Sequence, residues 1–169
     1  VADRSLACTV LGQKLDWPML VAPMAFQRLA HPEGELGTAR AANATGTGMI
    51  LSTLSTTSIE EVRATCTGPL WFQLYIYRDR EASKALVQRA EAAGCDALVL
   101  TVDSPMLGRR ERDIRNGFHV PEGTPVPNLT GAPRDTLAAA GHTASSLATF
   151  VQQHWDASIS WRDLEWLQS

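Results

Sequence analysis

The sequence contains few cysteines and no long apolar run. Its three cysteines, Cys8, Cys66 and Cys95, are odd in number and form no Cys-x-x-Cys pair. This pattern argues against a disulfide framework and favours buried thiols in a reducing compartment. No apolar run approaches the ~20 residues that a membrane span needs, and the first residues carry no signal-peptide pattern. We therefore expect a cytoplasmic protein without a membrane partner.

The sequence also has no concentration of positive charge and no common cofactor motif. Its net charge is −3, and Glu111 and Asp113 interrupt the five arginines between Arg109 and Arg134. No basic stripe forms, so we expect no nucleic-acid partner. No Gly-x-Gly-x-x-Gly follows an apolar run, no Walker loop is present, and no histidine or cysteine spacing suits a metal.

Four short apolar runs are the clearest structural signal that the sequence does contain. They occupy residues 19–22, 49–51, 70–74 and 97–102. Each run is continuous rather than alternating, which is typical of strands buried on both faces of a parallel sheet. The length of 169 residues suits a single domain.

Helical segments separate these runs. Residues 34–44 are rich in alanine and amphipathic. Ser58 and Glu61 have the spacing of a capping box, and residues 80–93 form a helical pattern that Gly94 can end. The alternation predicts an α/β fold built from successive βα units.

The alternation stops after Asp103. Residues 104–159 are rich in proline, glycine, threonine and arginine, with one predicted helix at residues 145–154. A connection of this length is usually a lid or a mobile segment. Ser160 and Asp163 then form a further helix start. A closed TIM barrel needs eight βα units in ~250 residues, more than this chain contains. We therefore expect the front part of a TIM (β/α)8 barrel, made of four βα units and a lid.

Small or polar residues follow each predicted strand. In parallel barrels the functional side chains lie at the carboxyl ends of the strands. Taken singly, each of these residues could be a satisfied strand hydroxyl or a turn former. Taken together they predict a site, made of Pro23, Met24, Ala25, Ser52, Gln73, Tyr75, Thr101 and Asp103.

Three charged residues at and after the end of the fourth predicted strand suggest chemistry. Asp103 ends an apolar run, so we expect a buried carboxylate that orients a catalytic histidine, although a turn in Asp-Ser-Pro is the alternative. None of the four histidines is an obvious partner. Arg109 and Arg110 offer guanidinium groups suited to a small carboxylate, or solvated lid charge. Tyr75 shares a strand face with Gln73, and we expect Tyr75 to point inward.

Five collinear stretches carry a family resemblance: VAPMAFQRLAHPEGELGTARAA, ILSTLSTTSIEEV, GPLWFQLYIYRDR, AEAAGCDALVLTVDSPMLGRRERDIRNGF and SISWRDLEWLQ. They resemble the FMN-dependent (S)-2-hydroxy acid oxidases and dehydrogenases, which include enzymes that oxidise glycolate, lactate and mandelate. The resemblance covers nearly all of the chain except residues 124–157. It implies an FMN enzyme, homotetrameric, that oxidises a small (S)-2-hydroxy acid to the 2-oxo acid, with oxygen or another acceptor reoxidising the flavin.

The resemblance also implies roles for individual residues. Tyr75 matches a tyrosine that contacts flavin and substrate, Asp103 the partner of the catalytic histidine, and Arg110 the lid arginine that reaches the substrate carboxylate. The implied cofactor-binding residues are Pro23, Met24, Ala25, Ser52, Gln73 and Thr101.

The sequence departs from the family in two respects. The family's catalytic histidine, flavin-binding lysine and phosphate site would follow residue 169, so we expect this segment alone to be inactive and the rest of the barrel to be its partner. Leu54 replaces a tryptophan of glycolate oxidases, which suggests a roomier pocket. Two alternatives stay open: a non-catalytic half-barrel that self-associates, and another phosphate-binding barrel enzyme such as an isomerase.

Overall fold

The computed structural model describes residues 3–104, 108–129 and 146–168. Contacts within the chain divide it into two compact units. The first unit comprises Val1–Leu74, Ala85–Val99 and Pro125–Thr130, and the second comprises Tyr75–Lys84, Leu100–Thr124 and Gly131–Ser169.

The main sheet has four strands in the order β3-β4-β5-β6. These strands are β3 (Leu20–Val21), β4 (Gly48–Ser52), β5 (Leu70–Leu74) and β6 (Ala97–Leu100). The β3–β4 and β4–β5 pairs are parallel, and the register places Ser52 opposite Gln73. The four predicted strands are therefore confirmed, and each one lies beside the next in chain order.

Burial explains why the apolar runs are continuous. All five residues of β5 are buried, and Met49 and Leu51 of β4 are fully inaccessible. A strand covered on both faces has no solvent side that would require alternating polar residues. The prediction of strands buried on both faces is therefore confirmed for β4 and β5. It was wrong for β3 and β6, which lie at the edges of the sheet and are half-buried or exposed.

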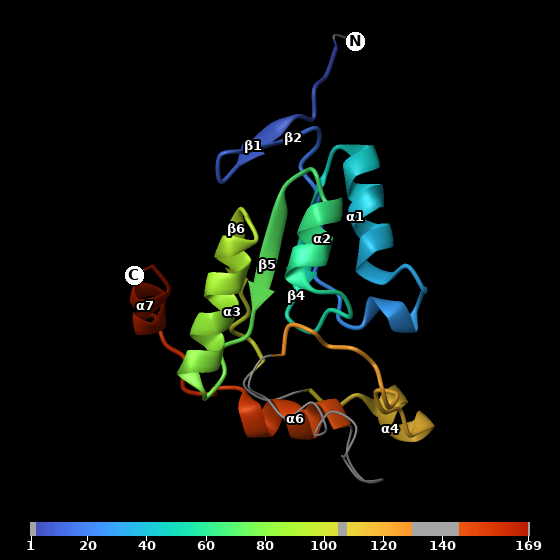
Figure 1. Cartoon of the computed structure of the whole chain (residues 1–169), viewed down its shortest axis with the longest axis vertical. Coiled ribbons are helices and arrows are strands. Elements are labelled where there is room, and N and C mark those ends of the chain that lie inside the picture. The colour runs from blue at the N-terminus through green and yellow to red at the C-terminus, as the bar shows by residue number, and fades with distance from the viewer. Residues whose placement is uncertain (1–2, 105–107, 130–145, 169) are drawn as a thin grey trace. The chain divides into compact units, whose positions relative to one another are not determined.

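Three helices follow the strands of this sheet: α1 (Gly34–Thr45), α2 (Ile59–Thr65) and α3 (Arg80–Ala92). Figure 1 shows α1 and α2 next to each other beside β4. The predicted capping box is present, because Glu61 N–H donates to Ser58 Oγ at 3.2 Å and Ser58 N–H donates to Glu61 Oε2 at 3.1 Å. Gly94 follows α3 with φ +82°, the left-handed conformation that ends a helix.

Four elements were not predicted. A hairpin pairs β1 (Cys8–Val10) with β2 (Gln13–Leu15), and η1 (Gln27–Leu29) and α4 (Glu111–Asn116) are short. The two-residue turn of the hairpin is Leu11-Gly12, with φ values of 46° and 78°. Such turns usually have asparagine or aspartate at the first position. Here that position is a leucine, which rarely adopts a positive φ.

The second unit contains α4, α6 (Ser146–His154) and α7 (Arg162–Gln168). The two helices predicted late in the chain are confirmed, and Ser160 N–H donates to Asp163 Oδ2 at 2.6 Å ahead of α7. Arg80 Nη2 forms ion pairs with Asp156 at 2.6 Å and Asp163 at 3.0 Å. Of the predicted lid, residues 105–107 and 130–145 lie outside the described residues.

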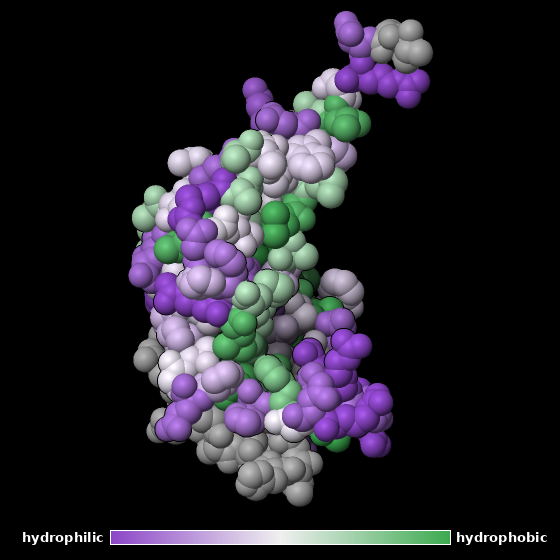
Figure 2. Space-filling model, turned by 90° about the vertical axis from the view of Figure 1, so that its right-hand side faces the viewer, coloured by the Kyte–Doolittle hydropathy of each residue, from purple (hydrophilic) through white to green (hydrophobic). Residues whose placement is uncertain are grey.

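Several large apolar side chains are open to solvent. Met19 and Met24 of the first unit are 56% and 51% exposed, and Figure 2 shows green, apolar surface beside purple, polar surface on the face that it presents.

Among the residues that the structure describes, no helix combines the length and the hydropathy needed to cross a membrane.

Candidate functional site

A loop rich in hydroxyl groups follows β4 and forms the centre of the polar structure in the first unit. This hydroxyl loop, residues 52–58, has the sequence Ser-Thr-Leu-Ser-Thr-Thr-Ser and is buried apart from Ser58. Buried hydroxyl and amide groups need hydrogen-bond partners. Three buried polar side chains from elsewhere in the first unit supply them, namely Glu35, Gln73 and Asn128.

Gln73 holds the start of the hydroxyl loop from β5. Its Oε1 accepts hydrogen bonds from Thr53 N–H at 3.2 Å and from Ser52 Oγ at 3.4 Å. Thr53 Oγ1 donates to the Gln73 carbonyl oxygen at 2.5 Å, and Leu54 N–H donates to Ser52 Oγ at 3.1 Å. The structure thus brings together two predicted cofactor-binding residues, Ser52 and Gln73, at the carboxyl ends of adjacent strands.

Glu35, in the first turn of α1, holds the middle of the hydroxyl loop. Its side chain is fully buried and accepts hydrogen bonds from Thr56 N–H at 2.8 Å, Thr56 Oγ1 at 2.6 Å and Thr57 Oγ1 at 2.9 Å. A further hydrogen bond comes from Gln27 N–H at 3.3 Å. Such charge-assisted bonds offset the cost of burying a carboxylate. Glu35 therefore links the segment after β3 to the loop after β4.

The segment after β3 contains Pro23, Met24 and Ala25. Pro23 and Met24 are exposed, while Ala25 is half-buried. The next residue, Phe26, has φ 53° and donates its N–H to the Leu54 carbonyl oxygen at 3.0 Å. A left-handed phenylalanine costs energy and persists only where its surroundings determine it. The segment is therefore a fixed apolar surface, bonded to the hydroxyl loop and open to solvent.

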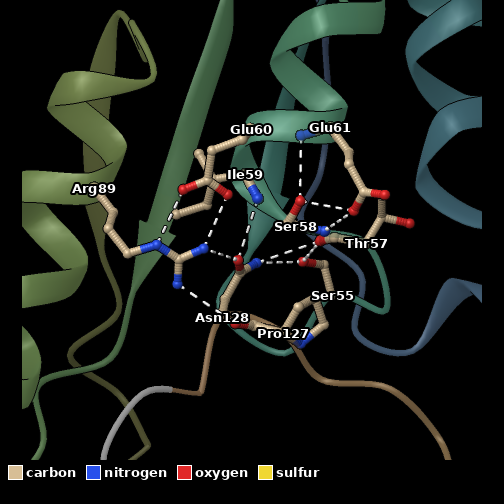
Figure 3. A network of polar contacts seen from close by, with 9 residues as sticks. All are labelled: Ser55, Thr57, Ser58, Ile59, Glu60, Glu61, Arg89, Pro127 and Asn128. Atoms are coloured by element: carbon tan, nitrogen blue, oxygen red, sulfur yellow. Dashed lines mark hydrogen bonds and ion pairs between the residues drawn. The ribbon is translucent and has the colours of Figure 1, made fainter.

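Asn128 holds the far end of the hydroxyl loop, as Figure 3 shows. This fully buried side chain donates from Nδ2 to Ser55 Oγ at 2.7 Å and to the Thr57 carbonyl oxygen at 3.4 Å. Its Oδ1 accepts from Ile59 N–H, at the start of α2, at 3.1 Å. One amide thus fixes both the loop and the amino terminus of the helix that follows it.

An ion pair supports Asn128 from α3. Arg89 donates from Nε and Nη2 to the two carboxylate oxygens of Glu60 at 3.0 and 2.9 Å, and from Nη1 to the Pro127 carbonyl oxygen at 3.4 Å. The hydrogen bond from Arg89 lowers the pKa of Glu60 below its ordinary value. Figure 3 shows the two-pronged contact beside Asn128.

Part of the predicted lid is therefore built into the first unit. Val126 and Leu129 are 4% and 1% exposed on either side of Asn128. Neither Asn128 nor Glu35 was among the predicted site residues. The available signals were a polar residue between two apolar ones and an acidic residue in a helix's first turn, and neither is specific.

The three predicted catalytic residues, Tyr75, Asp103 and Arg110, all belong to the second unit. Burial raises the pKa of the half-buried Tyr75 phenol, the charge of Asp103 raises it further, and the charge of Arg110 lowers it. The three side chains are thus close enough for their charges to interact. The phenol is protonated at neutral pH and can donate a hydrogen bond.

The surroundings of Asp103 differ from the expectation. We expected a buried carboxylate, but Asp103 is exposed and accepts a hydrogen bond from Ser104 Oγ at 3.2 Å. The expectation of burial was wrong for this chain, because the apolar run ends before Asp103 and the neighbouring Val102 is itself 65% exposed. Thr101, the other predicted residue at this strand end, is half-buried.

The two lid arginines differ in how firmly they are paired. Arg109 Nε lies 2.9 Å from Glu111 Oε1, whereas Arg110 Nη1 lies 3.9 Å from Asp113 Oδ2. Both arginines are largely exposed. Because its ion pair is longer, the Arg110 guanidinium is more available than that of Arg109 to donate hydrogen bonds to another carboxylate.

The predicted site residues therefore form two groups. Residues 23–25, Ser52 and Gln73 lie in the first unit, and Tyr75, Thr101, Asp103 and Arg110 lie in the second. In the first group, an exposed apolar segment adjoins hydroxyl and amide groups, a combination that suits a flat ring with polar edges. Among the described residues, no cluster of histidine, cysteine, aspartate or glutamate side chains could hold a metal ion.

The parallel sheet, with polar side chains at the carboxyl ends of its strands, places the chain in the class of α/β proteins of the TIM-barrel type. The comparison with known families is more specific. Residues 1–169 match the model of the FMN-dependent dehydrogenase family, and the chain belongs to that family.

Relatives and solved structures agree with this membership. The chain is 52% identical over 173 residues to an L-lactate oxidase from Nostoc sp., covering 100% of this chain and 47% of the relative. It is 47% identical to glycolate oxidase 3 from Arabidopsis thaliana, covering 100% and 45%. A crystal structure of mandelate oxidase with (S)-4-hydroxymandelic acid matches with a TM-score of 0.89 and 41% identity, covering 97% of this chain and 45% of that one.

The chain thus spans about half the length of the curated relatives that it matches. The mandelate oxidase match likewise confirms the predicted fold class, an α/β chain corresponding to 45% of a TIM barrel. Membership in the FMN-dependent family favours the flavin interpretation over a phosphate-binding isomerase.

Proposed function

We propose that the protein acts within a complete FMN-dependent barrel that oxidises a small (S)-2-hydroxy acid to the 2-oxo acid. The observation that carries the proposal is the buried Ser52 hydroxyl beside the Gln73 amide at the ends of adjacent parallel strands, in a chain of this family. The names of its relatives, L-lactate oxidase and glycolate oxidase, support the substrate class. In this proposal residues 1–169 form the front part of one FMN-binding domain, with residues 104–159 at its active-site entrance.

The first unit would hold the flavin. Ser52 and Gln73 of this unit would hydrogen-bond the polar edge of the ring, and Pro23, Met24 and Ala25 would lie against its face. Thr101, which belongs to the second unit, stays a predicted cofactor-binding residue. The fit rests on the donor set: a buried hydroxyl and a buried amide lie side by side, next to an apolar segment that is open to solvent. When bound, FMN supplies an acceptor for the two electrons removed from the substrate.

The second unit would bind and orient the substrate. The protonated Tyr75 phenol donates a hydrogen bond to the substrate hydroxyl or carboxylate, because its raised pKa keeps the proton on the oxygen. Arg110 binds the substrate carboxylate by charge-assisted hydrogen bonds. Asp103 would orient a histidine that accepts the substrate proton and that another part of the barrel supplies.

Several finer features are also proposals. Leu54 is 3% exposed in the hydroxyl loop, and a leucine in place of a tryptophan would leave more room beside the substrate. The protein would work in the cytoplasm as a homotetramer, with oxygen or another acceptor reoxidising the flavin. A half-barrel that self-associates without catalysis is the competing prediction.

The experiment is a substrate panel with the complete, FMN-loaded protein. Lactate and mandelate would be supplied as separate (S) and (R) forms, and glycolate, which is achiral, as a single compound. The 2-oxo acid formed would be measured. We expect product from at least one (S) substrate and much less from its (R) form. A flavin-loaded protein that forms no 2-oxo acid from any of them would contradict the proposal.

A further inference from the structure

Tyr75 has an aromatic neighbour that the proposed function does not explain. The rings of Tyr75 and Trp155 are stacked, with centroids 3.7 Å apart and an interplanar angle of 19°. Trp155 directly follows α6 and is 5% exposed. A nearly parallel stack restricts the tilt and rotation of the phenol ring, because either motion would bring the two rings into collision.

The backbone fixes Trp155 next to the strand exit that carries Tyr75. Trp155 and Tyr77 pair in an isolated antiparallel bridge. Two backbone hydrogen bonds flank the bridge, one from Arg78 N–H to the His154 carbonyl oxygen at 2.9 Å and one from Asp156 N–H to the Ile76 carbonyl oxygen at 2.9 Å. The position of Trp155 is therefore set by main-chain contacts that do not involve the Tyr75 side chain.

Two arginines reinforce this arrangement. Arg78 Nε donates to the Trp155 carbonyl oxygen at 3.2 Å, and Arg80 Nη2 donates to Asp156 Oδ2 at 2.6 Å. A hydrogen bond from the Ser158 hydroxyl lowers the pKa of Asp156, so this carboxyl group stays ionised and paired at neutral pH. Both sequence neighbours of Trp155, His154 and Asp156, are therefore fixed by hydrogen bonds.

The ring of Trp155, rather than its N–H group, makes the contact with Tyr75. Within the part of the chain that the structure describes, the buried Nε1–H has no hydrogen-bond partner. A phenylalanine at this position would keep a flat ring and remove the unpaired donor. A leucine would fill part of the space without offering a flat face.

We propose that Trp155 is a positioning residue, which fixes the ring plane of Tyr75 and thereby the direction of the Tyr75 hydroxyl in the reaction. The inference rests on the role given to Tyr75 in the proposed function. Tyr75 remains the residue that touches the substrate, and Trp155 acts through it. A misdirected hydroxyl impairs the reacting geometry, which is where small displacements reduce rates by up to about 10²-fold.

The test is a double-mutant cycle in the complete, FMN-loaded protein, with kcat measured per bound flavin. The variants are Trp155→Leu, Trp155→Phe, Tyr75→Phe and the double variant Tyr75→Phe/Trp155→Leu. We expect Trp155→Leu to lower kcat about tenfold, with Trp155→Phe close to the wild type. In the Tyr75→Phe background, Trp155→Leu should change kcat less than about twofold, because residues that act through one another are not additive.

A control separates positioning from general loss of packing. Phe150 is buried in α6 and its ring contacts that of His154 in a tilted arrangement, with ring centroids 4.7 Å apart. Phe150→Leu should destabilise the protein without the coupling to Tyr75 that Trp155→Leu shows.

A spectroscopic measurement accompanies the cycle. Tyrosinate absorbance is recorded against pH, and the signal of Tyr75→Phe is subtracted. The pKa of Tyr75 should be lower in Trp155→Leu than in the wild type, because burial is the main cause of its rise.

The outcomes distinguish the two proposals. An active wild type in which Trp155→Leu leaves kcat unchanged, or lowers it equally in both Tyr75 backgrounds, would overturn the positioning role alone. A flavin-loaded wild type that oxidises no 2-hydroxy acid would overturn the proposed function and the positioning role with it.

Discussion

Replacing Asn128 with alanine is expected to destabilise the protein, because the amide is fully buried and joins three groups of the first unit. Ile59 N–H would lose the partner that the structure gives it, at the start of α2. Ser55 Oγ and the Thr57 carbonyl oxygen would still bond each other at 2.8 Å, so they would lose less.

The magnitude follows from this distinction. An orphaned buried donor costs about 1–3 kcal/mol, and each of the two other lost bonds about 0.5–1.5 kcal/mol. The expected loss is therefore about 2–6 kcal/mol, a large share of the ~5–15 kcal/mol by which a domain is stable. Weaker FMN binding should accompany it, since the hydroxyl loop carries Ser52.

The assay is urea denaturation followed by far-ultraviolet circular dichroism, for the wild type, Asn128→Ala and the control Asn116→Ala. Asn116 is exposed at the end of α4, and its replacement should change the free energy of unfolding by less than about 0.5 kcal/mol. If Asn128→Ala were as mild as the control, the reasoning that Asn128 holds the hydroxyl loop would be refuted.

Three further predictions concern chemistry, pH and backbone. Tyr75→Phe and Asp103→Asn should each lower turnover by ~10²–10⁴ with circular dichroism unchanged; full turnover in both would remove those roles. The lowered pKa of Glu60 means that the Arg89 contact stabilises the fold above the ordinary value of 4.5 and is lost as the pH falls below it; Glu60→Gln should flatten acid denaturation curves there, and curves of equal slope would count against this. Gly46→Ala should lower the melting temperature, since φ is +64° and an added Cβ would collide with a neighbouring carboxylate; an unchanged melting temperature would contradict this.

Local signals in the sequence predicted most of the regular structure. The continuous apolar runs correspond to β3 to β6, and the Ser58–Glu61 spacing predicted a capping box that both hydrogen bonds confirm. These features depend on neighbours within a few positions, so the sequence displays them directly. The Leu11-Gly12 hairpin escaped prediction because its turn uses an unusual residue at positive φ.

Long-range polar partners could not be predicted in the same way. Asn128 lies 73 positions from Ser55, and Glu35 lies 21 positions from Thr56. Nothing near either residue in the sequence specifies its partner, because the contact depends on how distant segments fold together. Asp103 shows the converse error: an apolar run led us to expect burial, but Val102, the last residue of the run, is 65% exposed, and Asp103 is exposed as well.

The most direct test of the proposed function is anaerobic reduction of the bound flavin. The complete, FMN-loaded protein would be mixed with (S)-lactate, glycolate or (S)-mandelate without oxygen, and the yellow flavin absorbance would be followed in the wild type and in Tyr75→Phe. We predict rapid loss of the absorbance with at least one substrate and a much slower loss in Tyr75→Phe. An absorbance that persists with every substrate, or that falls equally fast in both proteins, would contradict the account.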